Sequence, residues 1–197
     1  MWTELSRAFR LTVALTALTG LLYPAAVTGV AQALFPFQAH GSLLSAGGVT
    51  VGSALLGQNF SRPEYFHPRP SSAGPGGYDA SQSGGSNLGP TSRALVERVR
   101  AGAARYRLEN PGYHGPIPAD AVTASASGLD PDISPANAAI QARRVAEARG
   151  IPLDDVRSLV RQRTVPPWLG FVGEPRVNVL QINLELDRRF GAVGGAR

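Results

Sequence analysis

The chain has 197 residues, no cysteine and a formal net charge of +5, and all 19 of its positively charged side chains are arginine. Without cysteine there can be no disulfide, no thiolate metal site and no cysteine nucleophile. The arginines are spread along the chain with acidic residues between them, whereas nucleic-acid-binding surfaces cluster their cations, so we expect no nucleic-acid partner.

An uncharged apolar run extends from Leu11 to Phe35 near the N-terminus. At 1.5 Å per residue this run is long enough to cross a hydrocarbon core of about 30 Å, so it predicts a transmembrane helix. Gly20 and Pro24 would weaken a soluble helix, but membrane helices tolerate both where neighbouring helices pack closely. We therefore take these two residues as candidate contacts with partner helices.

The arginines flanking the apolar run indicate its orientation. Arg7 and Arg10 precede the run, and the next arginine after it is Arg62. Positive residues favour the cytoplasmic side, so the N-terminus is expected in the cytoplasm of a bacterium and the bulk of the chain outside it. The sequence thus predicts a cytoplasmic tail (1–10), a single-pass helix in the inner membrane (11–35) and an extracytoplasmic domain (36–197).

A cleaved signal peptide is the alternative interpretation of the same run. Ala31, Gln32 and Ala33 form an A-x-A-like cleavage site, although the run is longer than the usual apolar region of a signal peptide. Cleavage would release a secreted hydrolase or binding protein. Both interpretations place the domain outside the cytoplasm.

The remaining sequence predicts a small α+β domain that follows the membrane helix. One or two strands are expected in Val49–Phe60, and the Pro-, Gly- and Ser-rich stretch Pro68–Pro90 predicts a long loop. An amphipathic helix is expected over Thr91–Arg107, with Leu95, Val96, Val99, Ala103 and Tyr106 on its apolar face.

Helices are also expected in the C-terminal half. Ser134 as N-cap and Pro135 at the first helical position begin one helix, which ends at Gly150. Another helix follows Pro152. The stretch Asn178–Phe190 alternates like a strand, yet it begins with a capping-box pattern, and we favour a helix there.

Motifs for catalysis are missing from the sequence. The three histidines lie far apart, so no metal site is proposed, and there is neither a G-x-S-x-G motif nor, without lysine, a phosphate-binding P-loop. No catalytic residue is proposed. Asp130 and Asp132 could bind a cation, but a tight turn leading into the helix at Ser134 explains them better.

Two segments keep two interpretations each. The loop Ser83–Asn87 (SGGSN) either forms a backbone nest for an anion or is an ordinary Gly- and Ser-rich loop. The cluster Tyr65–Arg69 either caps a partner surface, with Tyr65, Phe66 and Arg69 as contacts, or forms an aromatic plug beneath the long loop.

Several ordered blocks together resemble the KdpC family, the C subunit of the Kdp-type potassium-transporting ATPase complex. The blocks are GSALLGQNF, YFHPRPSS, SGGSNLGPT, VTASASGLDPDISPANAAIQARRVAEARG and GEPRVNVLQINLELD, and they follow the single apolar segment. They cover nearly the whole chain, whereas the stretch between Arg105 and Ala119 departs from the pattern.

The resemblance implies a non-catalytic accessory subunit. Its partners would be a channel-like potassium-translocating subunit, a P-type ATPase subunit and a small single-helix subunit, and the complex, not this chain, would handle ATP and K⁺. The family's C subunit has been assigned either assembly and a potassium inlet or a catalytic chaperone role in ATP binding. The latter role would use Ser83, Gly84, Gly85, Ser86, Asn87 and Gln141.

The orientation argues against direct ATP contact, because a domain outside the cytoplasm meets little ATP. We therefore prefer the assembly and inlet role. A third interpretation, a cytoplasmic nucleotide-binding domain with the opposite topology, is motivated by SGGSN and opposed by Arg7 and Arg10.

Overall fold

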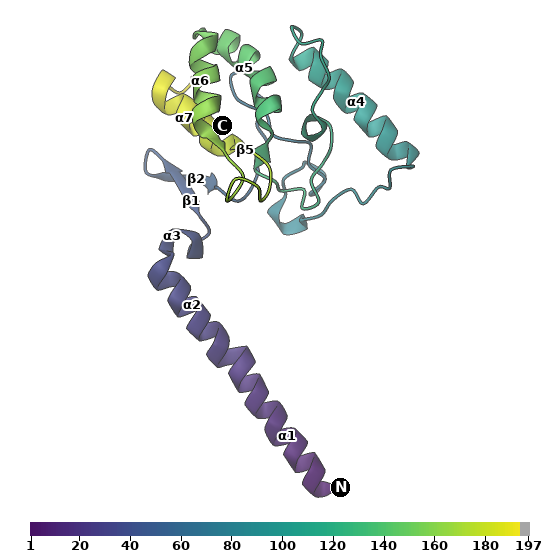
Figure 1. Cartoon of the computed structure of the whole chain (residues 1–197), viewed down its shortest axis with the longest axis vertical. Coiled ribbons are helices and arrows are strands. Elements are labelled where there is room, and N and C mark those ends of the chain that lie inside the picture. Colours follow the sequence, from purple (N-terminus) through teal and green to yellow (C-terminus); the bar gives the residue numbers. More distant parts are fainter. Residues whose placement is uncertain (194–197) are drawn as a thin grey trace. The chain divides into compact units, whose positions relative to one another are not determined.

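The computed structural model describes residues 1–193, and the chain divides into two compact units. The first unit is Met1–Leu43, and the second begins at Leu44. The first unit is built on a long helix, and the second is a folded domain of helices and short strands (Figure 1).

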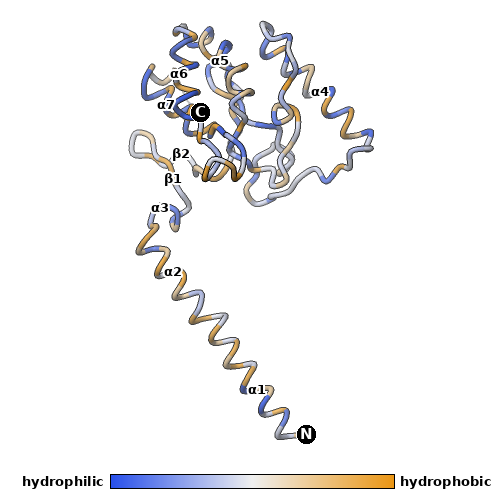
Figure 2. The backbone as a smooth tube through the Cα atoms, viewed as in Figure 1, coloured by the Kyte–Doolittle hydropathy of each residue, from blue (hydrophilic) through white to orange (hydrophobic). Residues whose placement is uncertain are grey.

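The long helix consists of α1 (Trp2–Ala17), a π-helical turn η1 (Leu18–Leu22) and α2 (Tyr23–Leu34). None of its residues is buried, and apolar residues occupy most of its length after the first turns (Figure 2). Among residues 1–193, this is the one helix long and apolar enough to cross a membrane. The helix begins at Trp2, so the residues predicted as a cytoplasmic tail are also helical.

The π-helical turn accommodates the two residues that interrupt the apolar run. Pro24 has no backbone N–H, and a proline ring crowds the carbonyl four residues earlier, which here belongs to Gly20. The wider turn η1 contains Gly20 and closes with the Tyr23 N–H bonded to the Leu18 carbonyl, five residues back. The helix therefore continues through this region.

A short helix, α3 (Pro36–Ala39), precedes a two-stranded sheet of β1 (Leu43–Ala46) and β2 (Val49–Ser53). Gly47 and Gly48, at the tip between the strands, both have positive φ, as the favoured two-residue hairpin turn requires. The strand prediction for Val49–Phe60 is confirmed for its first half only.

The predicted long loop is confirmed, and within it the structure adds only a 3₁₀ turn, η2 (Ala80–Gln82). The next helix, α4 (Arg93–Glu109), is also confirmed. Its buried Tyr106 packs with Ala121 and Val122, at and just after a second 3₁₀ turn, η3 (Ala119–Ala121).

The C-terminal helices follow their capping signals. In α5 (Pro135–Arg149) the Ser134 hydroxyl accepts the Asn137 N–H at 3.1 Å, and Gly150 ends the helix with φ of +64°. Next comes α6 (Leu153–Arg163). The ambiguous final stretch is a helix, α7 (Val179–Phe190), whose first turn is capped by the Asn178 side chain, which accepts the Gln181 N–H at 3.0 Å.

A small antiparallel sheet joins these helices. Its strands are β3 (Asp132–Ile133), β4 (Thr164–Val165) and β5 (Arg176–Asn178), in the order β3-β5-β4. Strands of two or three residues are too short to show a period in sequence, so this sheet was not predicted. The α+β class is nevertheless confirmed, and the main core comprises Phe66, Ile133, Ala138, Ala142, Val145, Ala146, Val156, Leu159, Val160, Val177, Val179, Ile182 and Leu186.

One carboxylate of α7 is enclosed by arginines. Glu185 is 5% exposed and pairs with Arg163 of α6 and with Arg188 and Arg189 of its own helix. The hydrogen bond from Arg188 is the largest of the effects that lower the pKa of Glu185 from 4.5 to about 2. This cluster links α6 to α7.

Replacing Glu185 tests this link. Because the folded pKa is lowered, the cluster stabilises the fold above pH 4.5 and its contribution is lost as the pH falls through about 2. We expect Glu185→Gln to lower the free energy of unfolding at neutral pH by about 1–3 kcal/mol and to flatten its pH dependence between those values. Thermal unfolding of the full chain in detergent measures both. Glu147→Gln, which breaks an exposed pair with Arg143, should change little.

Candidate functional site

Two helix-borne amide side chains hold the segment that follows Tyr65. Asn183 of α7 accepts the Phe66 N–H at 2.8 Å and donates to the Phe66 carbonyl at 3.0 Å. Gln141 of α5 does the same for the next residue, accepting the His67 N–H at 2.7 Å and donating to its carbonyl at 3.1 Å. We call these two side chains the amide clamps. Together they form the hydrogen bonds that a neighbouring strand would otherwise make with the backbone of Phe66 and His67.

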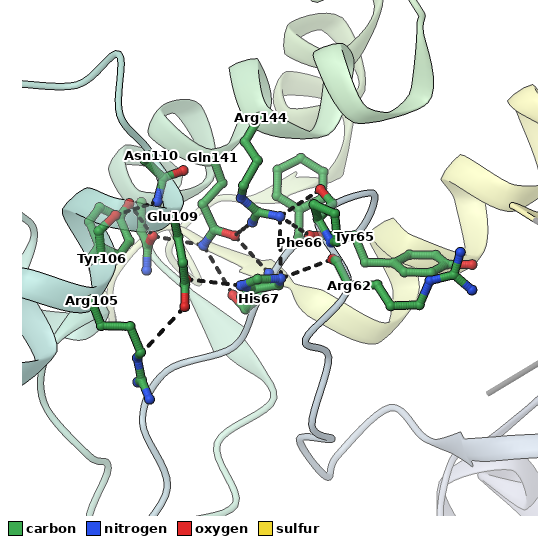
Figure 3. A network of polar contacts seen from close by, with 12 residues as sticks. Arg62, Tyr65, Phe66, His67, Arg105, Tyr106, Glu109, Asn110, Gln141 and Arg144 are labelled. Carbon is green, nitrogen blue, oxygen red and sulfur yellow. Dashed lines mark hydrogen bonds and ion pairs between the residues drawn. The ribbon is translucent and has the colours of Figure 1, made fainter.

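Arg144 reinforces the clamp on α5 (Figure 3). Its guanidinium donates to the carbonyls of Pro63 and Tyr65, at 2.6 and 3.0 Å, and to the Gln141 side-chain oxygen at 2.8 Å. Burial lowers the pKa of Arg144 from its ordinary value. The guanidinium thus bonds both the backbone just before Phe66 and the side chain of Gln141.

The imidazole of His67 connects the segment to α4. Its Nδ1 lies 3.2 Å from Glu109 Oε2, and its Nε2 lies 3.0 Å from the Arg62 carbonyl. The hydrogen bond to His67 is the main cause of the lowered pKa of Glu109. Both ring nitrogens therefore have partners within the domain, which indicates a structural role for this histidine.

A second polar chain links α4 to the clamp. The Tyr106 hydroxyl donates to Asn137 Oδ1 at 2.8 Å, and the same oxygen accepts from Gln141 Nε2 at 2.9 Å. Asn137 in turn donates to Asp120 at 3.0 Å. Burial raises the pKa of Tyr106 well above its ordinary value, so its hydroxyl is a permanent donor.

A cleft of about 800 Å³ opens beside these networks. Its lining includes residues 59–61, most of the stretch from His67 to Gly77, one side of α4 and Gln141. The charged side chains around it are mostly basic, with Arg69, Arg98 and Arg105 opposing the single carboxylate of Glu109. Such a lining disfavours a cation such as K⁺.

The SGGSN loop lies elsewhere in the domain. The Gly84 N–H donates to the Ser127 carbonyl at 2.8 Å, and the Ser83 hydroxyl reaches the same oxygen at 3.1 Å. Gly85 faces Ala126 so closely that a Cβ atom would lie 2.9 Å from the Ala126 carbonyl oxygen. Gln141 lines the cleft, whereas none of Ser83, Gly84, Gly85, Ser86 and Asn87 does.

Arg69 stabilises a turn inside the domain. Its guanidinium bonds Asp130 at 2.7 Å and approaches the Thr123 carbonyl, while its own carbonyl accepts the Tyr78 hydroxyl at 2.7 Å. The other Asp130 oxygen accepts the Asp132 N–H at 3.0 Å. These bonds agree with the turn interpretation of the two aspartates.

Tyr65 and Phe66 also make internal contacts. Phe66 has no exposed surface and sits in the main core, as in the aromatic-plug interpretation. The Tyr65 ring packs 4.8 Å from the Arg149 guanidinium, and its hydroxyl donates to Asp187 at 3.0 Å. Arg149 closes the triangle by bonding Asp187 at 2.8 Å.

Sequence reasoning missed Asn183, Asn137, Arg144 and Arg149. The available signal was an amide on the apolar side of a helix: Asn183 follows Ile182 on the buried face of α7, and Asn137 and Gln141 lie among the alanines of α5. A buried amide needs a hydrogen-bond partner, so the sequence shows that such a residue forms hydrogen bonds but not with which group.

Removing the α5 clamp tests its importance. Gln141→Leu keeps the side-chain size but leaves the His67 N–H and carbonyl without partners, so we expect a loss of about 2–4 kcal/mol in the free energy of unfolding. Gln162→Leu on the exposed side of α6 removes one bond to Ser158 and is the matched control. Equal urea midpoints for the two variants in detergent would contradict this role.

Known proteins are similar to this chain along nearly its whole length. The sequence model of the KdpC family, described as the c chain of the K⁺-transporting ATPase, matches residues 5–188. Proteins named potassium-transporting ATPase KdpC subunit are similar: that of Caulobacter vibrioides is 61% identical over 89% of this chain and 88% of its own length. Those of Beijerinckia indica and Myxococcus xanthus are each 56% identical, over 96% and 100% of this chain and 96% and 93% of their own lengths. The chain therefore belongs to the KdpC family.

Proposed function

We propose that the chain is a non-catalytic, membrane-anchored subunit of a potassium-transporting ATPase complex. The proposal rests on the family match over residues 5–188, together with relatives named potassium-transporting ATPase KdpC subunit that align along nearly their whole length. Its partners are the potassium-translocating subunit, the ATP-hydrolysing subunit and the small single-helix subunit of the complex.

The polar networks of the domain support a structural role. In the part of the chain that the structure describes, the buried amides are used inside the domain: Asn137 and Gln141 bond each other, and Asn183 holds the Phe66 backbone. A catalytic group needs an open position next to a substrate. ATP hydrolysis accordingly belongs to a partner subunit.

The long helix supplies the anchor. Its apolar length suits a single membrane crossing, and Arg7 and Arg10 at its start favour a cytoplasmic N-terminus. The domain from Leu44 then lies on the extracytoplasmic side of the inner membrane. Gly20 and Pro24, both exposed along the helix, offer a place for close packing against partner helices.

Assembly is the role we favour, with the domain held over the potassium inlet of the complex. The arginine-lined cleft is not offered as an ion path, because its charge opposes K⁺. We do not extend the proposal to ATP binding, since the Gly84 N–H and the Gln141 amide are both committed to bonds within the domain.

Single cysteines test the orientation, because the chain has no native thiol. Thr91→Cys, at an exposed position before α4, should react with a membrane-impermeant thiol reagent in intact spheroplasts. Ser6→Cys, near the start of the long helix, should react only after lysis. The reverse labelling pattern would show that the domain is cytoplasmic.

Replacing the membrane helix tests the role in assembly. Exchanging residues 11–35 for an unrelated apolar helix keeps the anchor but removes the surface around Gly20 and Pro24, so less of the complex should co-purify with the chain. A milder variant, Gly20→Leu, should act in the same direction, and Val13→Leu on the same helix is its control. Full recovery of an active, potassium-stimulated ATPase after the exchange would contradict a role of this helix surface in assembly.

A further inference from the structure

An exposed apolar hairpin projects from the edge of the small sheet. It comprises residues 166–175, between β4 and β5, and we call it the aromatic finger. Its tip exposes three large apolar side chains: Trp168 is 69% exposed, Leu169 66% and Phe171 78%. This is the most apolar exposed turn that the structure describes in the second unit, where large apolar side chains are otherwise mostly buried.

The finger is built as an ordered hairpin and not as a loose loop. At its base Val165 pairs with Arg176, and further out Trp168 and Val172 exchange both backbone hydrogen bonds at 2.9 Å. Leu169 and Gly170 turn the chain with positive φ. Because the backbone is already ordered, little conformational entropy is lost when the tip is buried.

The base of the finger lies where the chain enters the domain from the long helix. Asn178, the last residue of β5, donates to the carbonyl of Ala54, directly after β2, at 2.9 Å. The linker between the helix and β1, residues 35–42, spans at most about 30 Å when fully extended. The finger therefore arises near the point at which the tether enters the domain.

One exposed arginine beside the finger complements a phospholipid headgroup. Arg161 precedes the finger and is exposed, whereas Arg163 and Arg176, on its two sides, already pair with Glu185 and Asp132, and Glu174 is the one acidic residue within the finger. Guanidinium groups bind phosphate well, tryptophan favours the boundary between headgroups and acyl chains, and phenylalanine and leucine on an amphipathic surface insert at the same depth. The apolar tip thus suits the acyl side of that boundary, and the flanking arginine suits its headgroup side.

We propose that the aromatic finger inserts Trp168, Leu169 and Phe171 into the interface of the bilayer in which the chain is anchored. The finger then gives the domain a second attachment besides the long helix, and it restricts rotation of the domain about its tether. The inference rests on the membrane anchoring proposed above, which flotation of the chain with vesicles tests separately.

Tryptophan fluorescence can locate the finger. The chain has two tryptophans, so Trp2→Phe leaves Trp168 as the single reporter. This full-length variant is reconstituted in vesicles of phosphatidylethanolamine and phosphatidylglycerol, with and without bromine on the lipid acyl chains. We expect bromolipid to remove most of the Trp168 emission and acrylamide, added from the water, to quench it only weakly.

The matched control moves the reporter to another exposed apolar position. Trp2→Phe, Trp168→Phe and Leu108→Trp together place a tryptophan on α4, where Leu108 is 81% exposed. Acrylamide should quench this reporter strongly and bromolipid should not. Equal quenching of the two reporters, or a Trp168 emission unaffected by bromolipid in chains that float with the vesicles, would overturn the proposal.

The assembled complex provides the decisive comparison. If Trp168 is still quenched by bromolipid after the partner subunits are added, the bilayer is the occupant in the working complex. Loss of that quenching on assembly, with continued protection from acrylamide, would assign the finger to a partner subunit and overturn the proposal.

Discussion

The domain depends on the two amide clamps that hold Phe66 and His67. Buried backbone groups must be hydrogen-bonded, and this stretch belongs to no strand. Asn183 and Gln141 each offer one acceptor and one donor at the right spacing for a single residue's carbonyl and N–H. With its backbone satisfied in this way, Phe66 can enter the core between the helices, and the segment becomes the element that joins α5 to α7.

Arginine supplies the remaining cross-links in a chain without lysine. Arg144 bonds the carbonyls of Pro63 and Tyr65, and Arg149 bonds the Glu64 carbonyl together with Asp187. A planar guanidinium with several donors can hold more than one carbonyl at once, which a lysine ammonium does less rigidly. Part of the positive charge of this chain is thus used in bonds inside the domain.

The bonds within the domain also involve residues that the sequence proposed as partner contacts. Tyr65, Phe66 and Arg69 were candidate partner contacts, yet each bonds or packs within the domain, and their substitution would act first on its stability. The surfaces on which our proposals rest are the unburied helix around Gly20 and Pro24 and the aromatic finger. One suits the inside of a membrane, and the other suits its boundary.

The sequence alone determined the features that arise from local chemistry. The apolar run required a long unburied helix, and the caps at Ser134, Gly150 and Asn178 correctly set the limits of α5 and the helical nature of α7, because each cap satisfies backbone groups only a few residues away. The ordered motifs also led to the correct family. Tertiary structure decided the rest: the clamp of Gln141 on His67 joins residues 74 positions apart, and that of Asn183 on Phe66 joins residues 117 apart. An amide side chain has the same bonding capacity wherever it is placed, so only the packing of α5 and α7 could select which backbone it would hold.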